Sequence, residues 1–501
     1  MYLYVNILII YRKMPKYKQP LSLKELTLKS LKNFVLEFGC YLMEQLHEHE
    51  EGDIWQSLTN FLHPGLPYSL ANQLTENLLG IVPILEKKAE GSMYSPHHSK
   101  DSIGMYLNVV ERLVKVAIQP HLLELNLCDC SEFVCEVLCR NLYRLSNLES
   151  LEVKAIYSKG RKMAIRKIMK QNICFLKKLK TFKCENICTD EIIEVVAENC
   201  RQLENLNVKF SKHVTVQSTR AICMLQNLKC LNIWGTFIDK EACGVLLNQL
   251  KDLETFISDQ DKIITNVTGA LKMKKLMTIC EPPDLVVSMC PQLTDITLHF
   301  VECNLSILTS LPNLKKFSVS NCNFDDIQTI LESKSSQLFF LKLSEVRGVN
   351  LKIVNSCENL KSLQLLQCSY QPEISDFNNI HFKNLENLTI WEFYSPILQH
   401  IFSAYVSLKT VNLGKVPVLK DNIVYSLASK NKETLIEVTF KSCANLHIDT
   451  LKFLVDSCDN LHRLVYKNED SEFDHLSDLY ILKVYIEHKN LDVELVVDEP
   501  W

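Results

Sequence analysis

The stretch CENLKSLQLLQC, residues Cys357 to Cys368, contains the pattern that decides the fold. Its apolar residues follow the spacing L-x-x-L-x-L, with Leu360, Leu363 and Leu365 in the three places. The L-x-L part alternates apolar and polar residues, which is typical of a short β-strand with one buried face. The stretch therefore predicts a strand that packs its leucines on one side.

The same pattern recurs from about residue 122 to about residue 466, mostly at intervals of 21 to 27 residues. That interval is the period of leucine-rich repeats. The residues between copies have helical spacing, as in Ile192, Ile193, Val196 and Ala197, so each copy predicts a strand followed by a helix. The first leucines of the copies are Leu122, Leu148, Leu179, Leu203, Leu228, Leu253, Leu293, Leu314, Leu338, Leu360, Leu385, Leu408, Leu435 and Leu461.

A single copy cannot bury its own leucines, so the copies must stack against one another. The predicted fold class is α/β, a leucine-rich-repeat horseshoe with parallel strands on the concave face and helices on the convex face. About fourteen repeats would occupy residues 109–466, with a carboxy-terminal cap at 467–501. Residues 257–290 interrupt the array, and they hold either one degenerate repeat around Met273 and Leu276 or an insertion.

Polar residues between the strand leucines should point out of the concave face, because side chains alternate along a strand. This face is the candidate surface for a target protein. The candidate contact residues are Glu124, Asn126, Lys229, Asn232, Lys361 and Gln364.

The composition gives no support to catalysis or to nucleic-acid binding. The 501 residues carry a net charge of -4 and only 12 glycines, and they contain no Gly-rich phosphate loop, nucleophile elbow or zinc-protease helix. Cys128 and Cys130, and Cys184 and Cys188, overlap strand ends and predict core positions rather than metal ligands. We therefore expect no catalytic, cofactor-binding or metal-binding residues, and a chain that is not an enzyme.

The 20 cysteines lie inside apolar patterns, which indicates reduced, buried side chains and a cytoplasmic or nuclear location. One set stands three residues before a first leucine and another closes the strand. This arrangement resembles the cysteine-containing repeats of ubiquitin-ligase receptors such as the F-box proteins, over about two thirds of the chain. The two sets are Cys200, Cys290, Cys357 and Cys458, and Cys130, Cys322, Cys368 and Cys443.

The repeats are preceded by segments of different character. Residues 1–14 predict a disordered tail or an over-extended start. Their apolar part, MYLYVNILII, is too short to span a bilayer, and no other apolar stretch approaches the length of a membrane-spanning helix. Residues 15–85 predict a small helical domain, and the polar residues 86–108 predict a linker. We expect no membrane partner.

Within the helical domain, Ser22, Leu23, Thr27 and Leu31 have the spacing of one helix face behind a serine N-cap. The spacing resembles the elongin-binding box of cullin ubiquitin-ligase receptors: a small residue, leucine, usually cysteine four residues later, and an aliphatic residue after four more. Thr27 departs from the pattern, because it stands where the family has the cysteine that enters an elongin C pocket.

Further along, Leu66, Pro67, Leu70 and Leu74 fit the cullin-selecting box that follows the elongin-binding box in the same families. Proline suits a first helical turn, where its missing N–H would be unpaired anyway. The three leucines then form a stripe along the helix.

Two such boxes in this order, ahead of leucine-rich repeats, resemble the von Hippel-Lindau-box receptors of the Zyg-11, Zer-1 and PRAME type. The resemblance implies a non-catalytic substrate-recognition subunit of a cullin-RING ubiquitin ligase, with elongin B/C and a cullin as partners and an unidentified target protein on the repeats. Two alternatives stay open. The Leu66-Pro67 opening also resembles an F-box, which would bind Skp, and the first 85 residues could simply cap a scaffold protein without a ubiquitin role.

Overall fold

A computed structural model describes residues 23–45, 56–58, 60, 68–82, 84–85, 100–120, 122–128, 130–154, 159–370, 382–392, 407–416, 419–443, 446–467 and 475–497. The chain divides into two compact units: residues 21–273 make up the first, and residues 274–501 lie in the second. Each unit is described below by itself.

The first unit begins with three helices, α2 (Leu23–Gln45), α4 (Tyr68–Leu79) and α6 (Lys100–Ala117), which pack on one another. Gly39 of α2 lies close to Leu113 of α6, so that a Cβ there would be 3.4 Å from Leu113 Cδ1. The predicted linker at 86–108 is wrong in its second half, because α6 already begins at Lys100. Its helical apolar spacing overrides the polar residues at its start.

Strand and helix repeats follow in the first unit, and its six described strands pair in parallel in chain order. The strands are β1 (Glu124–Asn126), β2 (Ser150–Lys154), β3 (Thr181–Glu185), β4 (Asn205–Asn207), β5 (Cys230–Asn232) and β6 (Thr255–Ile257). The helices are α7 (Glu132–Arg140), α8 (Lys159–Asn172), α9 (Asp190–Asn199), α10 (Thr219–Cys223) and α11 (Lys240–Gln249), with 3₁₀ turns at Leu142–Arg144, Ile173–Phe175, Val216–Ser218 and Ile263–Asn266.

The second unit repeats the same arrangement, and its described strands also pair in parallel in chain order. The strands are β7 (Lys275–Thr278), β8 (Asp295–His299), β9 (Lys316–Asn323), β10 (Phe340–Arg347), β11 (Ser362–Leu366), β12 (Asn387–Trp391), β13 (Thr410–Gly414), β14 (Glu437–Lys441), β15 (Arg463–Lys467) and β16 (Glu494–Val497). The helices are α12 (Pro283–Met289), α13 (Gln328–Ser333), α14 (Leu351–Asn355), α16 (Asp421–Lys430), α17 (Ile448–Ser457) and α18 (His475–His488), with 3₁₀ turns at Ser306–Ser310 and Phe324–Asp326.

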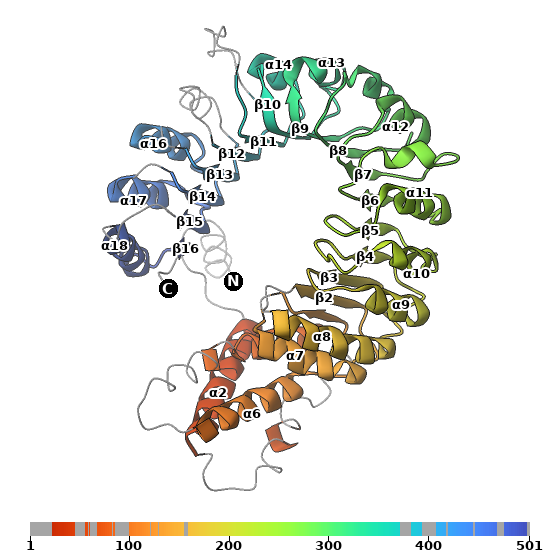
Figure 1. The fold of residues 1–501 in the computed structure, drawn as a ribbon. Helices are drawn as coiled ribbons and strands as arrows, with labels where there is room; N and C mark the ends of the chain where they lie inside the picture. The colour runs from red at the N-terminus through yellow and green to blue at the C-terminus, as the bar shows by residue number, and fades with distance from the viewer. Residues whose placement is uncertain are drawn as a thin grey trace, which may run out of the picture. The chain divides into compact units, whose positions relative to one another are not determined.

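The predicted α/β leucine-rich-repeat fold is confirmed. Figure 1 shows the strands of each unit side by side, with the helices along one side of them. Strand β7 answers the question left open at residues 257–290: the segment holds a degenerate repeat, with Leu276 in register with Ile296. Strand β16 lies in the segment predicted as the cap, where Leu495 is in register with Leu464.

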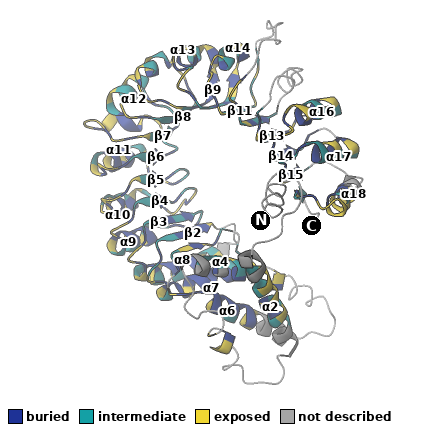
Figure 2. Cartoon of the chain, turned by 180° about the vertical axis from the view of Figure 1, so that it is seen from behind, coloured by how far each residue is buried: buried dark blue, intermediate teal, exposed yellow. Residues whose placement is uncertain are grey.

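The repeat leucines form the core between strands and helices, where Figure 2 shows the buried residues. The middle apolar residue of each strand stacks on that of the next, as Leu151, Phe182 and Leu206 do in β2, β3 and β4. All three are 0% exposed. Each repeat therefore supplies one layer of a continuous core.

Cysteines connect neighbouring repeats from both predicted positions. Cys200 Sγ, three residues before a first leucine, donates to the Leu176 carbonyl at 3.3 Å, and Cys443 Sγ, after a strand, donates to the Leu413 carbonyl at 3.4 Å. The small side chain fits under the turning backbone and bonds an oxygen of the preceding repeat. Further Sγ–carbonyl contacts join Cys357 to Leu331, Cys368 to Leu343 and Cys458 to Ala428.

Burial of these thiols makes stability depend on alkaline pH. It raises the pKa of Cys200, Cys290 and Cys322 from 9.0 to about 12. The folded state holds the thiol proton more tightly than the unfolded chain does. The stabilisation that the buried, protonated thiols contribute is therefore complete below pH 9.0 and is lost as pH rises toward about 12. We expect the melting temperature to fall more steeply between about pH 9 and 11 than between about pH 7 and 8.5, and less steeply in Cys200→Ala. Equal slopes in the two chains would contradict a role for Cys200.

Candidate functional site

The strand face is the side of each unit's sheet that is turned away from the helices of the repeats. Glu124 and Asn126 of β1 are exposed on it, and Asn232 of β5 and Gln364 of β11 are half-buried. Asn126 and Asn232 use their Oδ1 atoms locally, accepting from the backbone N–H of Cys128 at 2.9 Å and Trp234 at 3.1 Å. These two side-chain amides therefore stabilise the turn that follows each strand.

From the second repeat of the first unit onward, the residue directly after each first leucine alternates in charge. Glu149, Lys180, Glu204 and Lys229 occupy this position in four successive repeats, and Glu254 continues the series. Lys180 Nζ lies 2.8 Å from Glu149 Oε2, and Lys229 Nζ lies 2.8 Å from Glu204 Oε2. The hydrogen bond from Lys229 lowers the pKa of Glu204. We call this row, with its continuation in the second unit, the charge ladder.

In the second unit the charge ladder consists of Lys361, Glu386 and Lys409. Glu386 is 3.7 Å from Lys361 Nζ and 2.9 Å from Lys409 Nζ, and these contacts lower its pKa. The predicted target contacts Lys229 and Lys361 are thus exposed but paired within the chain. Sequence inspection missed the ladder, although the alternating signs at one repeat position were the available signal.

An aromatic ring lies over the strand ends in the second unit. Trp391 of β12 is in register with Gly414 of β13, and a Cβ built on Gly414 would be 2.0 Å from Trp391 Cε3. Only the absent side chain leaves room for the ring there. Trp391 is half-buried.

The predicted elongin-binding box begins outside the described residues, at Ser22. Leu23 and Thr27 lie in helix α2, as predicted, but their side chains are outside the described residues. Leu31 also lies in α2 and is half-buried. The helix is therefore present, and the docking role of these residues stays a prediction.

Helix α2 carries two faces of different exposure. Val35 is 1% exposed, whereas Phe34 is 48% exposed and stacks on Phe38 with ring centroids 6.2 Å apart. Leu31, Phe34 and Phe38 are spaced i, i+3 and i+7, so they share one stripe of the helix. An apolar stripe that remains partly open to solvent is typical of a docking surface.

The predicted cullin-selecting box is divided in the same way. Leu66 and Pro67 lie outside the described residues, while Leu70 and Leu74 lie in α4, with side chains outside them. Helix α4 begins at Tyr68, directly after the proline. Later in α4, Thr75 Oγ1 donates to the Ala117 carbonyl at 2.9 Å and so fixes the helix to the end of α6.

The described residues contain neither a metal-binding group of side chains nor a membrane-spanning helix. In the described ranges, no three or more His, Cys, Asp or Glu side chains are grouped so that they could hold a metal ion. Among the same residues, no helix combines the length and apolar character needed to cross a bilayer.

No family model matches the chain. Among solved structures, it is similar to a leucine-rich-repeat protein of Leptospira interrogans, at 15% identity and a TM-score of 0.30, over 77% of this chain and 91% of that one. It is also similar to a chain of the Rad7–Elc1 complex of yeast, at 14% identity and a TM-score of 0.42, over 68% of this chain and 91% of that one. Because a fold does not imply a function, the partners of neither protein transfer to this chain.

Proposed function

We propose that the chain is a non-catalytic substrate receptor of an elongin-containing cullin-RING ubiquitin ligase. Helices α2 and α4 dock on elongin and the cullin, and the strand faces of the repeats hold a target protein. The receptor needs no catalytic residue, because it only brings the target to the ubiquitin-charged enzyme. We propose a cytoplasmic or nuclear location, in keeping with the reduced cysteines.

The observation that supports the proposal is the apolar stripe of α2, in which Phe34 is 48% exposed. Leu31, Phe34 and Phe38 lie on the helix that also contains the elongin-box residues Leu23 and Thr27. Helix α4, with the second box, follows in the order that receptors of this type have, and packs on α2 in the same unit. Val35 is buried and Gly39 lies against Leu113 of α6, so a different side of α2 from the stripe packs on the neighbouring helices.

Replacing Leu23 and Thr27 together by aspartate is expected to weaken elongin B/C binding at least about tenfold, since a buried interface anchor typically contributes about 2 kcal/mol. The measurement is co-purification of elongin B and C with the tagged full chain from cells. Lys29→Glu, an exposed position on α2 outside the stripe, is the matched control and should bind as the wild type does.

Undiminished elongin capture by the double aspartate variant would refute the elongin-box assignment. Capture of Skp in place of elongin would identify an F-box receptor. If neither is captured and deletion of residues 15–85 makes the chain insoluble, the segment acts only as a cap for the first repeat. The Thr75–Ala117 hydrogen bond and the buried face of α6 are what such a cap would require.

A further inference from the structure

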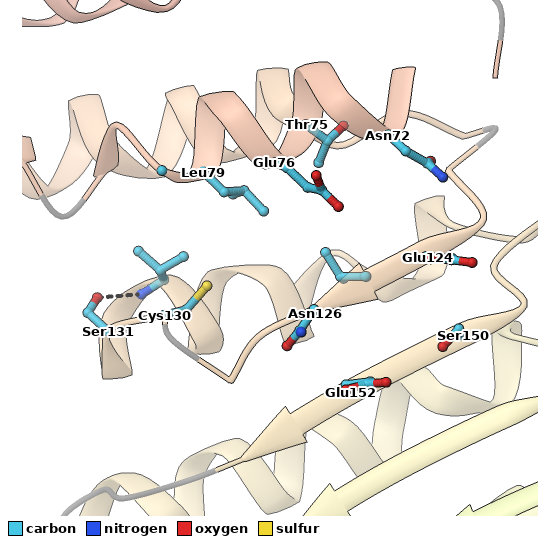
Figure 3. A pocket seen from close by; sticks show the side chains of 13 residues that line it. Asn72, Thr75, Glu76, Leu79, Glu124, Asn126, Cys130, Ser131, Ser150 and Glu152 are labelled. Atoms are coloured by element: carbon cyan, nitrogen blue, oxygen red, sulfur yellow. Dashed lines mark hydrogen bonds between the residues drawn. The ribbon is translucent and has the colours of Figure 1, made fainter. Parts of the chain in front are cut away.

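A cavity of about 480 Å³ lies in the first unit between helix α4 and strands β1 and β2. Figure 3 shows Glu76 and Leu79 extending from α4 toward the strands, with Glu124, Asn126 and Glu152 on the opposite wall. A volume of this size is in the range of ligand pockets and exceeds a single side chain. The cavity opens beside β1, where the predicted target contacts Glu124 and Asn126 are located.

Both walls of the cavity are fixed by hydrogen bonds. Thr75, 2% exposed, donates to the Ala117 carbonyl and holds α4 in place. On the other side, Ser131 caps helix α7 by accepting from the Val134 N–H at 3.4 Å, the dashed line in Figure 3. The cavity is therefore part of the folded unit rather than a gap at a loose contact.

The lining combines an apolar floor with acidic groups. Leu79, Leu125 and Val134 are buried apolar residues of the lining. Its charged members are three glutamates, and no lysine or arginine lines the cavity within the described residues. A ligand with an apolar stem and a cationic head would match this lining.

The three carboxylates differ in their partners. Glu152 Oε1 is 2.5 Å from Lys183 Nζ, so its charge is already matched. Neither Glu76 nor Glu124 forms an ion pair in the described part of the chain. Lys32 Nζ lies near Gly80 at one end of the cavity, 3.8 Å from where a Cβ of residue 80 would be. Two unmatched carboxylates on opposite walls can bond the two edges of one planar cation.

We infer that this cavity binds an arginine side chain of the target protein. The arginine stem lies on Leu79, Leu125 and Val134, and its guanidinium donates to Glu76 and Glu124. That the arginine belongs to a target protein rests on the proposed function. The preference for an arginine side chain follows from the residues that line the cavity. A neutral residue in its place would leave both exposed carboxylates hydrogen-bonded to water, and an acidic residue would add a like charge beside them.

The test is fluorescence polarisation with the full chain and a labelled ten-residue Gly/Ser peptide that contains a central Leu-Arg-Leu. Replacing the arginine by citrulline keeps its shape and removes its charge, so we expect binding to weaken roughly fivefold to tenfold. Glu76→Gln with Glu124→Gln should produce a similar loss and abolish the difference between the two peptides. Glu149→Gln, a charge-ladder carboxylate that does not line the cavity, is the matched control.

Equal binding of both peptides to the wild type, or an unaltered preference in the double variant, would overturn the inference. If a chain without residues 1–20 binds the peptide more than about tenfold more tightly, the basic stretch around Arg12 and Lys13 is the occupant, and the assignment to a target is overturned. Co-purification of elongin with the wild-type chain is an independent measurement. If elongin does not co-purify, the proposed function is refuted, but the preference for the arginine peptide is unaffected.

Discussion

Replacing Phe182 by alanine is expected to lower the free energy of unfolding by about 3 to 5 kcal/mol. Phe182 is 0% exposed and is stacked between Leu151 and Leu206 of the neighbouring strands. Alanine leaves a cavity inside a close-packed layer that couples three repeats, so the loss includes both the transfer of the ring and the lost contacts. The measurement is urea unfolding followed by far-ultraviolet circular dichroism.

Phe237→Ala is the matched control for this substitution. Phe237 lies in the same unit but is 62% exposed, so removing its ring should change stability by less than about 0.5 kcal/mol. A Phe182→Ala midpoint that coincides with that of Phe237→Ala would contradict the assignment of Phe182 to the core. If the two units unfold in separate transitions, the shift should appear in one of them only.

Gly414→Ala is expected to destabilise the chain by about 1 to 3 kcal/mol and to displace the ring of Trp391. The added methyl group would be 2.0 Å from Trp391 Cε3 and 2.3 Å from Cζ3, distances that the folded backbone cannot accommodate. The displaced ring should be more exposed to water, which a red shift of its fluorescence would report. Unfolding curves and emission spectra of the same samples check both effects.

Gly160→Ala provides the comparison for Gly414→Ala. Gly160 lies in helix α8, and a Cβ there would meet no atom within 4 Å, so alanine should leave stability unchanged or raise it by up to about 1 kcal/mol. Trp391→Leu should remove most of the cost of Gly414→Ala in a double-mutant cycle. Additive effects of the two changes would show that the ring is not the obstacle.

The strands that sequence inspection found have leucine in the first place and an apolar residue in the second. All but one of them, the copy with Ser258, also have an apolar residue in the third place. Strand β7 was left open between a degenerate repeat and an insertion, because Met273 stands in the first place and Thr278 in the third. Sequence inspection missed strand β16, because Asp492 stands at the position that is in register with Leu461, where the pattern has its first leucine. In both cases pairing with the neighbouring strand imposes the structure that the local pattern does not.

Of the predicted target contacts, Asn232 and Gln364 are half-buried and the other four are exposed, but their roles could not be read from single copies. Lys229 and Glu204 are one repeat apart in sequence, and their ion pair follows only when the copies are aligned in register. The cavity beside Glu124 requires α4 and β1 to come together, and the separation of these elements in sequence carries no local signal. Contacts of this kind depend on tertiary packing rather than on propensity.

A similar reason explains the asparagines that precede several first leucines. Asn227 Nδ2 donates to the Arg201 carbonyl at 2.8 Å, and Asn359 Nδ2 donates to the Ser336 carbonyl at 2.7 Å, so each connects its repeat to the one before. The recurring Asn-Leu pair was visible in the sequence as a repeat position. Its partner, a backbone oxygen of another repeat, was not.

The most direct test of the receptor function is titration of the purified full chain with purified elongin B/C in a calorimeter. The proposal predicts a one-to-one complex with a dissociation constant of about 1 μM or below, which corresponds to about 8 kcal/mol of binding free energy. It also predicts a dissociation constant at least about tenfold larger for the variant in which Leu23 and Thr27 are aspartate. Absence of binding by a wild-type chain whose circular dichroism and unfolding midpoint show it to be folded would contradict the central claim.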